Sequence, residues 1–235
     1  MGTPRTQKGR ARAISSLLAQ LYPDALCELD HRNPFELLTA TILSAQTTDV
    51  RVNMVTPRLF GRFPDPISLA GADPGEVEEI IRSTGFYQAK TRSVIGMAQA
   101  LLERFDGEVP TALDDLVTLP GVGRKTGNVV RSVAFRLPGL PVDTHVGRLS
   151  RRLGLTVEED PVKVETELGA LLPKAEWGDF SLRLILHGRR ICAAKKPLCA
   201  ECLLEPLCPS SQLPTRPERR RPPVTLQLRE FSGGV

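Results

Sequence analysis

The sequence predicts an all-α protein, and three observations carry that prediction. Apolar residues recur at helical spacing in most segments, as do Ile14, Leu18 and Leu21 near the N-terminus. Helix start signals that pair Asn or Asp with a following proline recur at Asn33-Pro34 and Asp73-Pro74. No two alternating apolar runs are joined by a hairpin turn, so we expect no β-sheet.

The first predicted helices follow these signals in order. The apolar stripe predicts a helix over residues 11–22, after a basic N-terminal segment. A second helix starts at Asn33-Pro34, runs to about residue 45 and is apolar nearly all round, which predicts that it is buried. We expect Pro57 to kink or restart the next helix, because proline lacks the N–H that a helix interior uses.

Turn residues divide the middle of the chain. The signal at Asp73-Pro74 opens a helix, and Thr84-Gly85 separates it from another helix over residues 88–105. After the next turn, we expect Thr111 to cap a short helix over residues 112–118.

The last third of the chain also reads as helical. A helix over residues 124–136 stops at Leu137-Pro138-Gly139, where we expect the chain to leave its first domain. Beyond Pro209 the composition turns to Ser, Pro and Arg, which predicts a flexible basic tail. Three further helices are predicted between these points, over residues 142–153, 161–171 and 177–191.

Length and composition narrow the class of protein. The 235 residues, of which 41% are hydrophobic, suffice for one large domain or two modest ones. No apolar run is long enough to span a membrane and no secretory signal is present, so we expect a reducing compartment and no membrane partner. The net charge of +4 allows nucleic-acid binding without requiring it. Ten Lys or Arg against four Glu lie from Ser181 onward, as either a solvated surface or a phosphate-facing strip.

Cysteine spacing is the most specific compositional signal. Four of the five cysteines, Cys192, Cys199, Cys202 and Cys208, follow the pattern C-x6-C-x2-C-x5-C. A disulfide framework is disfavoured in a reducing compartment, so clustered thiolates point to a thiophilic metal centre. Zinc and an iron–sulfur cluster both remain open, and one short segment around a single centre favours [4Fe–4S]. Cys27 stands apart, and we expect it to be a small buried apolar residue.

A glycine-rich loop lies between two predicted helices at Leu119-Pro120-Gly121-Val122-Gly123. Its glycines permit positive φ and a close backbone approach, and its N–H groups open a helix, which suits a DNA phosphate. The alternative is an ordinary helix connection. It is not a nucleotide-binding P-loop, because Arg124 separates Gly123 from Lys125.

Lys125 and Asp143, which follow the loop in sequence, carry chemistry that the loop alone does not. Lys125 and Thr126 fall in the first turn of the helix, where the macrodipole and the neighbouring Arg124 disfavour an ammonium ion and make an amine nucleophile available. Asp143, in Val142-Asp143-Thr144-His145, matches a helix N-cap. Taken singly, the lysine would be a surface residue and the aspartate a structural cap.

Together these features resemble the helix-hairpin-helix base-excision DNA glycosylases, and among them the endonuclease III family. The resemblance runs from about Ala11 to Cys208. Its carriers are Leu43-Ser44-Ala45-Gln46 with Thr48-Asp49, the loop that leads into Lys125, the Asp143 motif, Leu184-Ile185-Leu186-His187-Gly188-Arg189, and the four cysteines.

The resemblance implies two helical domains with a DNA-binding groove between them. A six-helix domain with the helix-hairpin-helix would cover residues 28–138. Residues 1–27 and 139–212 would form the cluster domain with its [4Fe–4S] centre, and 213–235 the basic tail. We expect a monomer and, if the source is bacterial, a cytoplasmic location on the nucleoid.

The resemblance also implies a reaction. Lys125 would attack C1′ of a damaged nucleotide flipped out of double-stranded DNA, and the resulting Schiff base would undergo β-elimination and nick the strand. Asp143 would accept a proton and stabilise charge at the sugar. The substrates would be oxidised pyrimidines and abasic sites, which makes the chain a bifunctional glycosylase and lyase.

Further DNA contacts are predicted in the same way. Gln46 resembles the family residue that fills the hole left by the flipped nucleotide. Thr84-Gly85-Phe86-Tyr87 departs from the aliphatic residues usual in the second wedge loop, and we predict Phe86 as the wedge on the opposite strand. The other predicted contacts are Gly121, Val122, Gly123, Arg124, Thr126, His145, Arg189, Lys195 and Lys196.

Two alternatives stay open at this point. An adenine-specific glycosylase of the same superfamily would have a catalytic glutamate where this chain aligns Thr41, and it generally lacks the lysine found here at Lys125. A non-catalytic protein could use the hairpin as a phosphate clamp and the metal centre as a brace. Its sign would be the loss of Lys125 or Asp143, and both are present.

Overall fold

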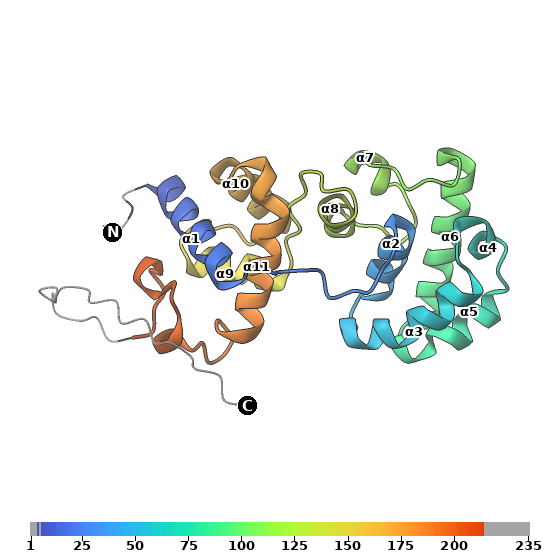
Figure 1. Cartoon of the computed structure of the whole chain (residues 1–235), viewed down its shortest axis with the longest axis horizontal. Coiled ribbons are helices and arrows are strands. Elements are labelled where there is room, and N and C mark those ends of the chain that lie inside the picture. Colours follow the sequence, from blue (N-terminus) through green and yellow to red (C-terminus); the bar gives the residue numbers. More distant parts are fainter. Residues whose placement is uncertain (1–3, 5, 214–235) are drawn as a thin grey trace, which may run out of the picture.

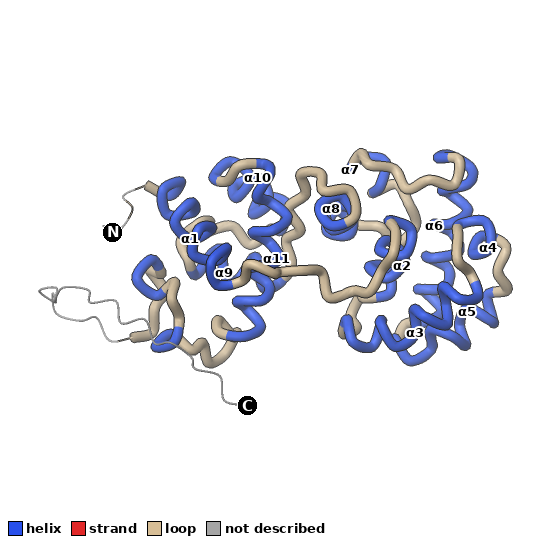
Figure 2. Tube along the Cα trace, in the orientation of Figure 1, coloured by secondary structure: helices blue, strands red, loops and turns tan. Residues whose placement is uncertain are grey.

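In the computed structural model, which describes Pro4 and residues 6–213, every regular element is a helix (Figures 1 and 2). The predicted all-α class is confirmed. The helices form two bodies along the long axis: α2 to α7 in one, and α1 with α9 to α11 in the other, while α8 lies at their junction (Figure 1). None of the described helices combines the length and apolar character that crossing a bilayer requires. The predicted tail beyond Leu213 lies outside the described residues.

The first body packs around α2 (Pro34–Leu43), in which every residue after Pro34 is buried, as the apolar sequence predicted. Asn33 begins this helix by accepting a hydrogen bond from the N–H of Glu36. Three helices pack against α2, namely α3 (Asp49–Arg62), α6 (Tyr87–Phe105) and α8 (Arg124–Val133). The other elements are α4 (Pro66–Ala70), α5 (Pro74–Ile81) and the 3-10 turn η1 (Arg82–Thr84), which contact α6, and α7 (Leu113–Leu116), which contacts α8.

The expected restart at Pro57 is corrected, and one helix of the first body was not predicted. Helix α3 runs through Pro57 without restarting, because Val52, Val55 and Leu59 on either side are buried and hold the helix on the core. The short helix α4 was not predicted, and it begins with a capping box in which the side chains of Asp65 and Ser68 each bond the other residue's N–H.

Two helix ends also differ from the predictions. Thr111 does not cap α7, because the helix begins one residue later and Ala112 takes the N-cap position. Helix α8 stops at Val133 instead of residue 136, because Arg136 turns to a φ of 53° and the N–H of Leu137 bonds back to the carbonyl of Arg131.

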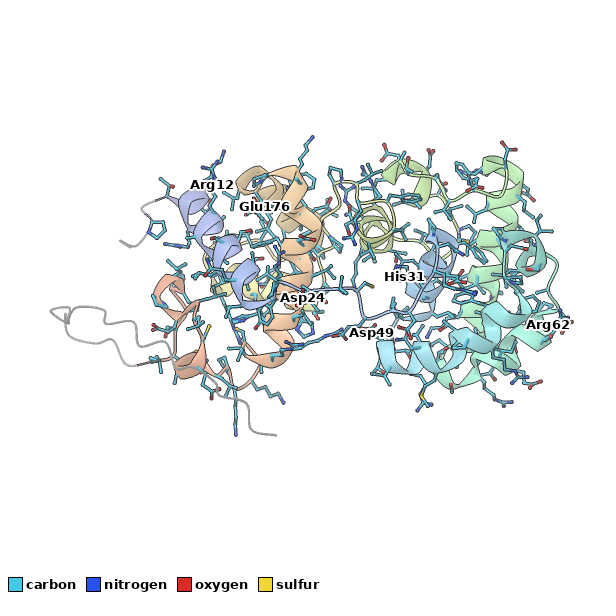
Figure 3. The ribbon with its side chains drawn as sticks, in the orientation of Figure 1. Arg12, Asp24, His31, Asp49, Arg62 and Glu176 are labelled. Carbon is cyan, nitrogen blue, oxygen red and sulfur yellow. The ribbon has the colours of Figure 1, made fainter. Side chains whose placement is uncertain are left out.

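The second body joins segments from both ends of the chain. Its helices are α1 (Gln7–Leu21), α9 (Thr144–Arg152), α10 (Pro161–Leu171) and α11 (Trp177–Arg190). Helix α1 starts four residues earlier than predicted, because Thr6 caps it by accepting from the N–H of Gly9. Ile14, Leu18 and Phe180 are fully buried in the shared core. The hydroxyl of Ser15 donates to Glu176, which lies beside α1 (Figure 3).

The cysteine segment closes the second body. After α11 it forms the 3-10 turns η3 (Cys199–Glu201) and η4 (Glu205–Leu207). Between residues 191 and 213 only Leu204 is buried. Apolar burial within this segment is therefore slight.

Candidate active site

The hairpin between α7 and α8 is anchored by side chains that it buries in the first core. Leu119 and Val122 are buried in the first core. Gly121 has a φ of 77°, and a Cβ there would lie 2.7 Å from the Cβ of Ser93 on α6, so only glycine fits. Gly123 is the N-cap of α8 and offers no side-chain acceptor. The N–H groups of the first turn of α8 are therefore left for an anion.

Lys125 and Asp143 meet at one cavity between the two bodies. Lys125 is exposed on the first turn of α8, and Asp143 is half-buried at the start of α9. Thr41 and Ser44 at the end of α2 line the same cavity. An amine, a carboxylate and two hydroxyl groups thus face one space, although they come from three separate parts of the chain.

Asp143 is held by its own helix. Its Oδ1 accepts from the N–H groups of His145 and Val146, each at 2.8 Å, as the predicted N-cap requires. Oδ2 makes no hydrogen bond to the described residues and remains for a group that enters the cavity. The N-cap hydrogen bonds therefore fix the position of the carboxylate and use only one of its two oxygens.

His145 lies beside this pair as a neutral ring. Burial lowers its pKa; the positive charges of Arg148, Arg189 and Lys125 lower it further, while the charge of Asp143 opposes them. Its Nδ1 lies 3.1 Å from the guanidinium of Arg148. The ring is thus fixed as a hydrogen-bond acceptor at neutral pH.

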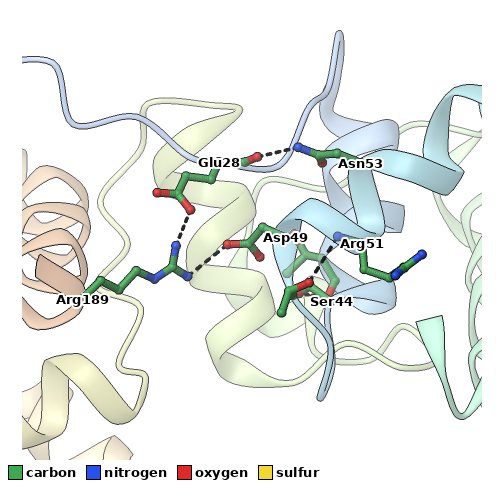
Figure 4. A network of polar contacts seen from close by, with 8 residues as sticks. Glu28, Ser44, Asp49, Arg51, Asn53 and Arg189 are labelled. Atoms are coloured by element: carbon green, nitrogen blue, oxygen red, sulfur yellow. Dashed lines mark hydrogen bonds and ion pairs between the residues drawn. The ribbon is translucent and has the colours of Figure 1, made fainter. Parts of the chain in front are cut away.

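Arg189 connects the two bodies at the edge of the cavity. From α11 it reaches both Glu28 and Asp49, the latter at 3.0 Å (Figure 4). Asp49 lies on the side of the first body that faces the second (Figure 3). Asn53 on α3 also donates to the carbonyl of Glu28 (Figure 4). The segment between α1 and α2, which contains Glu28, is therefore bound to the first body.

Several predicted DNA contacts have protein partners or lie elsewhere on the surface. The guanidinium of Arg124 forms two hydrogen bonds, of 2.8 and 2.9 Å, with Glu165 on α10. Thr126 is half-buried in the same turn of α8 as Lys125. Lys195 and Lys196 are exposed on the cysteine segment and do not line the cavity of Lys125. Their roles at DNA stay predictions.

The two predicted wedge residues lie on adjoining loops. Gln46 and Phe86 have φ values of 54° and 49°, and both side chains are exposed. The hydroxyl of Thr47 donates to the carbonyl of Thr84, which connects the two loops directly. The structure therefore brings together two residues that are far apart in the sequence.

The four clustered cysteines line a single cavity. Arg152 donates to the sulfur of Cys192 at 3.2 Å, and the sulfur of Cys202 lies 3.4 Å from Nε2 of His187. Within residues 6–213, no three His, Cys, Asp or Glu side chains are grouped as one metal ion needs. Four thiols around a common space are a donor set that zinc and an iron–sulfur cluster both accept. Cys27 packs half-buried against the first core instead.

Sequence patterns did not identify every residue around this cavity. Glu28 and Glu165, the carboxylate partners of Arg189 and Arg124, carry no local signal. Lys90 was also missed, although it is buried behind the loops of Gln46 and Phe86. A lysine within a helical pattern gives no sign in sequence that its amine points inward.

Three features occur together here: a lysine on the helix that follows a hairpin, an aspartate N-cap at the same cavity, and a segment with four cysteines. Together they define the class of helix-hairpin-helix base-excision DNA repair enzymes. The family model of the HhH-GPD superfamily base excision DNA repair protein matches residues 39–174, and the chain belongs to this superfamily. The matched range contains both Lys125 and Asp143.

More specific similarity is to endonuclease III. The protein of that name from Synechocystis sp. is 54% identical over 88% of this chain and 95% of its own length. The one from Bacillus subtilis is 45% identical, over 83% and 90%. A solved structure of a trapped endonuclease III–DNA covalent intermediate aligns with a TM-score of 0.83 at 45% identity, covering 87% of this chain and 96% of that one. The chain is accordingly a base-excision DNA glycosylase of the endonuclease III type.

Proposed function

We propose that the chain removes oxidised pyrimidines from double-stranded DNA and nicks the strand through a Schiff base on Lys125. The observation that carries this proposal is the shared cavity of Lys125 and Asp143 between the two bodies. The related endonuclease III that was trapped as a covalent intermediate with DNA supports the same chemistry. Abasic sites, which lack only the base, would enter the same cavity.

The proposed reaction needs a nucleophile and a proton acceptor. The Nζ of Lys125 forms a bond to C1′ as the bond from C1′ to the damaged base breaks, and the electron pair leaves with the base. Asp143 takes the proton that the amine loses, and its charge stabilises the positive sugar. The C1′–O4′ bond then breaks, and O4′ takes the proton held by Asp143, which leaves a Schiff base between Lys125 and C1′. Water takes a proton from C2′, a double bond forms between C2′ and C3′, and the C3′–O3′ bond breaks with its electron pair leaving on the 3′ phosphate.

Lesion access depends on DNA held across both bodies. We propose that the N–H groups at the start of α8 bind a phosphate, that Gln46 fills the space of the flipped nucleotide, and that Phe86 is the wedge on the opposite strand. Arg189 and the exposed Lys195 and Lys196 would add phosphate contacts and salt dependence. These contacts are independent of base sequence, as repair of scattered lesions requires.

The cysteine segment fits a [4Fe–4S] cluster held by Cys192, Cys199, Cys202 and Cys208. Four thiols line one cavity, and Arg152 donates to the sulfur of Cys192. Burial raises the pKa of Cys202 and Cys208, so a bound metal would be needed to hold them as thiolates. When bound, the cluster supplies a cross-link for a segment with little apolar burial. No catalytic proton transfer is assigned to it.

The two cores support the same domain limits as the sequence. We propose residues 28–138 as the six-helix domain and 1–27 with 139–212 as the cluster domain.

The side chain that α2 places at the cavity argues against the adenine-specific alternative. That alternative needs a catalytic glutamate at this position, whereas this chain has Thr41, whose hydroxyl donates to the carbonyl of Leu37. We also propose that the chain acts as a monomer and that it works in the cytoplasm, which its bacterial relatives favour.

Borohydride trapping tests the proposal. Purified protein is incubated with duplex DNA that carries thymine glycol, and covalent adducts are compared between the unmodified chain, Lys125→Ala and Lys174→Ala. The last removes an exposed lysine outside the cavity. We expect an adduct that only Lys125→Ala loses. An adduct that survives in Lys125→Ala would contradict the assigned nucleophile, and no adduct with either thymine glycol or an abasic site would contradict the lyase.

A further inference from the structure

Lys90 is the one lysine that is buried in the described part of the chain, with 5% of its surface exposed. It lies in the first turns of α6, and its Nζ donates to the carbonyl of Thr84 at 2.8 Å. No carboxylate pairs with it among the described residues, and burial lowers its pKa. A buried amine without a counter-charge is costly, so its single hydrogen bond requires an explanation beyond packing.

The acceptor of that bond is shared by a second loop. Thr47, just after Gln46, also donates its hydroxyl to the carbonyl of Thr84. Thr84 itself is buried, and its own hydroxyl donates to the carbonyl of Ile81. One carbonyl group thus joins the loop after α2 to the loop before α6, with Lys90 beneath it.

These loops carry two exposed residues in an unfavourable backbone conformation. Gln46 and Phe86 both have left-handed φ values, which residues with a Cβ adopt rarely. Asp106 and Arg136, the other such residues in the described chain, follow the ends of α6 and α8. There the conformation serves to terminate a helix.

Lys90 holds Phe86 as well as Thr84. Its backbone N–H donates to the carbonyl of Phe86 at 3.0 Å, so both ends of the short turn are bound to one residue. Phe86 begins α6 without a side-chain cap, and Gly85 before it has a φ of 69°. Without these bonds the turn would have little to keep the Phe86 side chain outward.

We propose that Lys90 is a positioning residue that, with Thr47 and the Thr84 carbonyl, holds Gln46 and Phe86 together as one preformed two-pronged wedge for duplex DNA. The inference rests on the proposed function. Loops that are already ordered insert without the entropy cost of fixing them during binding. We call Lys90, Thr47 and the Thr84 carbonyl the loop brace. The loop brace touches neither Lys125 nor Asp143, so its effect is confined to opening the duplex.

Because opening the duplex is separate from the chemistry at Lys125 and Asp143, we expect the loss of activity in a Lys90 variant to depend on whether the DNA is double-stranded. An abasic site in duplex DNA must be extruded and its place filled, whereas in single-stranded DNA there is no partner strand to separate. Lys90→Met keeps the length and apolar stem of the side chain and removes the donor. We expect about a tenfold loss of kcat/KM on the duplex, the size of one buried hydrogen bond, and less than about a twofold loss on the single strand.

The experiment measures cleavage of one abasic sequence, as duplex and as single strand, by the unmodified chain, Lys90→Met, Thr47→Val and the exposed-lysine control Lys174→Met. Thr47→Val tests the same carbonyl without altering the buried lysine. A 2-aminopurine opposite the abasic site reports wedge insertion by fluorescence. A duplex-selective loss in both loop-brace variants, with weaker fluorescence change and none in the control, supports the proposal.

Two outcomes overturn it. One is an equal loss on both DNA forms, which would show a general structural role. The other is full duplex activity in the loop-brace variants. In a Phe86→Ala background only Gln46 is left to position, so Lys90→Met should cost less on the duplex than it does in the unmodified chain, and a fully additive loss would also contradict a shared wedge. If the unmodified chain cleaves neither DNA form, the proposed function fails and the wedge fails with it.

Discussion

The first body closes around a continuous apolar core made by consecutive helices, whereas the second assembles α1, α9, α10 and α11 from both ends of the chain and ends in a segment with one buried residue. Polar contacts across long sequence separations add to the apolar core of the second body. Gln7 donates to the carbonyl of Leu155, and the hydroxyl of Tyr22 lies 3.0 Å from Nδ1 of His187.

This difference is a physical reason for the proposed metal centre in the second body. Where neighbouring helices can cover each other's apolar faces, no further cross-link is needed. The cysteine segment instead presents 3-10 turns and exposed side chains, which bury too little surface to order it alone. We therefore expect the two bodies to respond differently to the same kinds of change.

The largest expected effect comes from loss of the proposed cluster. Cys202→Ala should remove the brown absorbance and release the cysteine segment, because metal binding supplies the free energy that orders such segments. Amide hydrogen exchange should rise over residues 192–213 and stay slow in α2 and α6. Faster exchange in α2 to the same extent would break the distinction between the bodies. Cys27→Ala is the control, since Cys27 packs on the first core.

Core truncation is expected to come next in size. Leu38→Ala in the first core and Phe180→Ala in the second remove fully buried side chains and should each lower the free energy of unfolding by about 3–5 kcal/mol. Trp177, the only tryptophan, lies in the second body, so its fluorescence reports that body while circular dichroism reports both. If Leu38→Ala shifts the two signals equally, the bodies unfold as one unit.

Removal of the N-cap at the groove should have a moderate effect on stability. Asp143→Ala loses two backbone hydrogen bonds and should lower the free energy of unfolding by about 1 kcal/mol, whereas Asp143→Asn keeps an oxygen in the same position. Both variants should lose base removal. Asp160→Ala removes another cap of the second body and should cost stability alone. Full activity in Asp143→Asn would contradict the role of the carboxylate charge.

The smallest expected effect concerns the ion pair between Arg124 on α8 and Glu165 on α10. Arg124 and Glu165 are bidentate, but the arginine side chain is 45% exposed, so a double-mutant cycle should give less than about 1 kcal/mol and shrink with added salt. Arg58 and Glu79, an exposed pair within the first body, provide the control cycle. A coupling that is large and insensitive to salt would indicate a rigid junction between the bodies.

Local signals account for much of what the sequence determined by itself. Asn33 and Asp143 begin their helices as predicted, and the burial of α2 follows from its composition. Such features depend on hydrogen bonds and dihedral angles within a few residues, so they can be recognised in a short window of sequence. The loop at Gly121 and the spacing of the four cysteines belong to the same kind of information.

Tertiary structure alone decided the contacts between distant segments. The meeting of Lys125 with Asp143, the pairing of Arg124 with Glu165 and the burial of Lys90 depend on how whole helices pack. Each partner is an ordinary polar residue in its own segment. The free energy that brings such residues together comes from apolar surfaces elsewhere in the two cores, and no local pattern records where those surfaces meet.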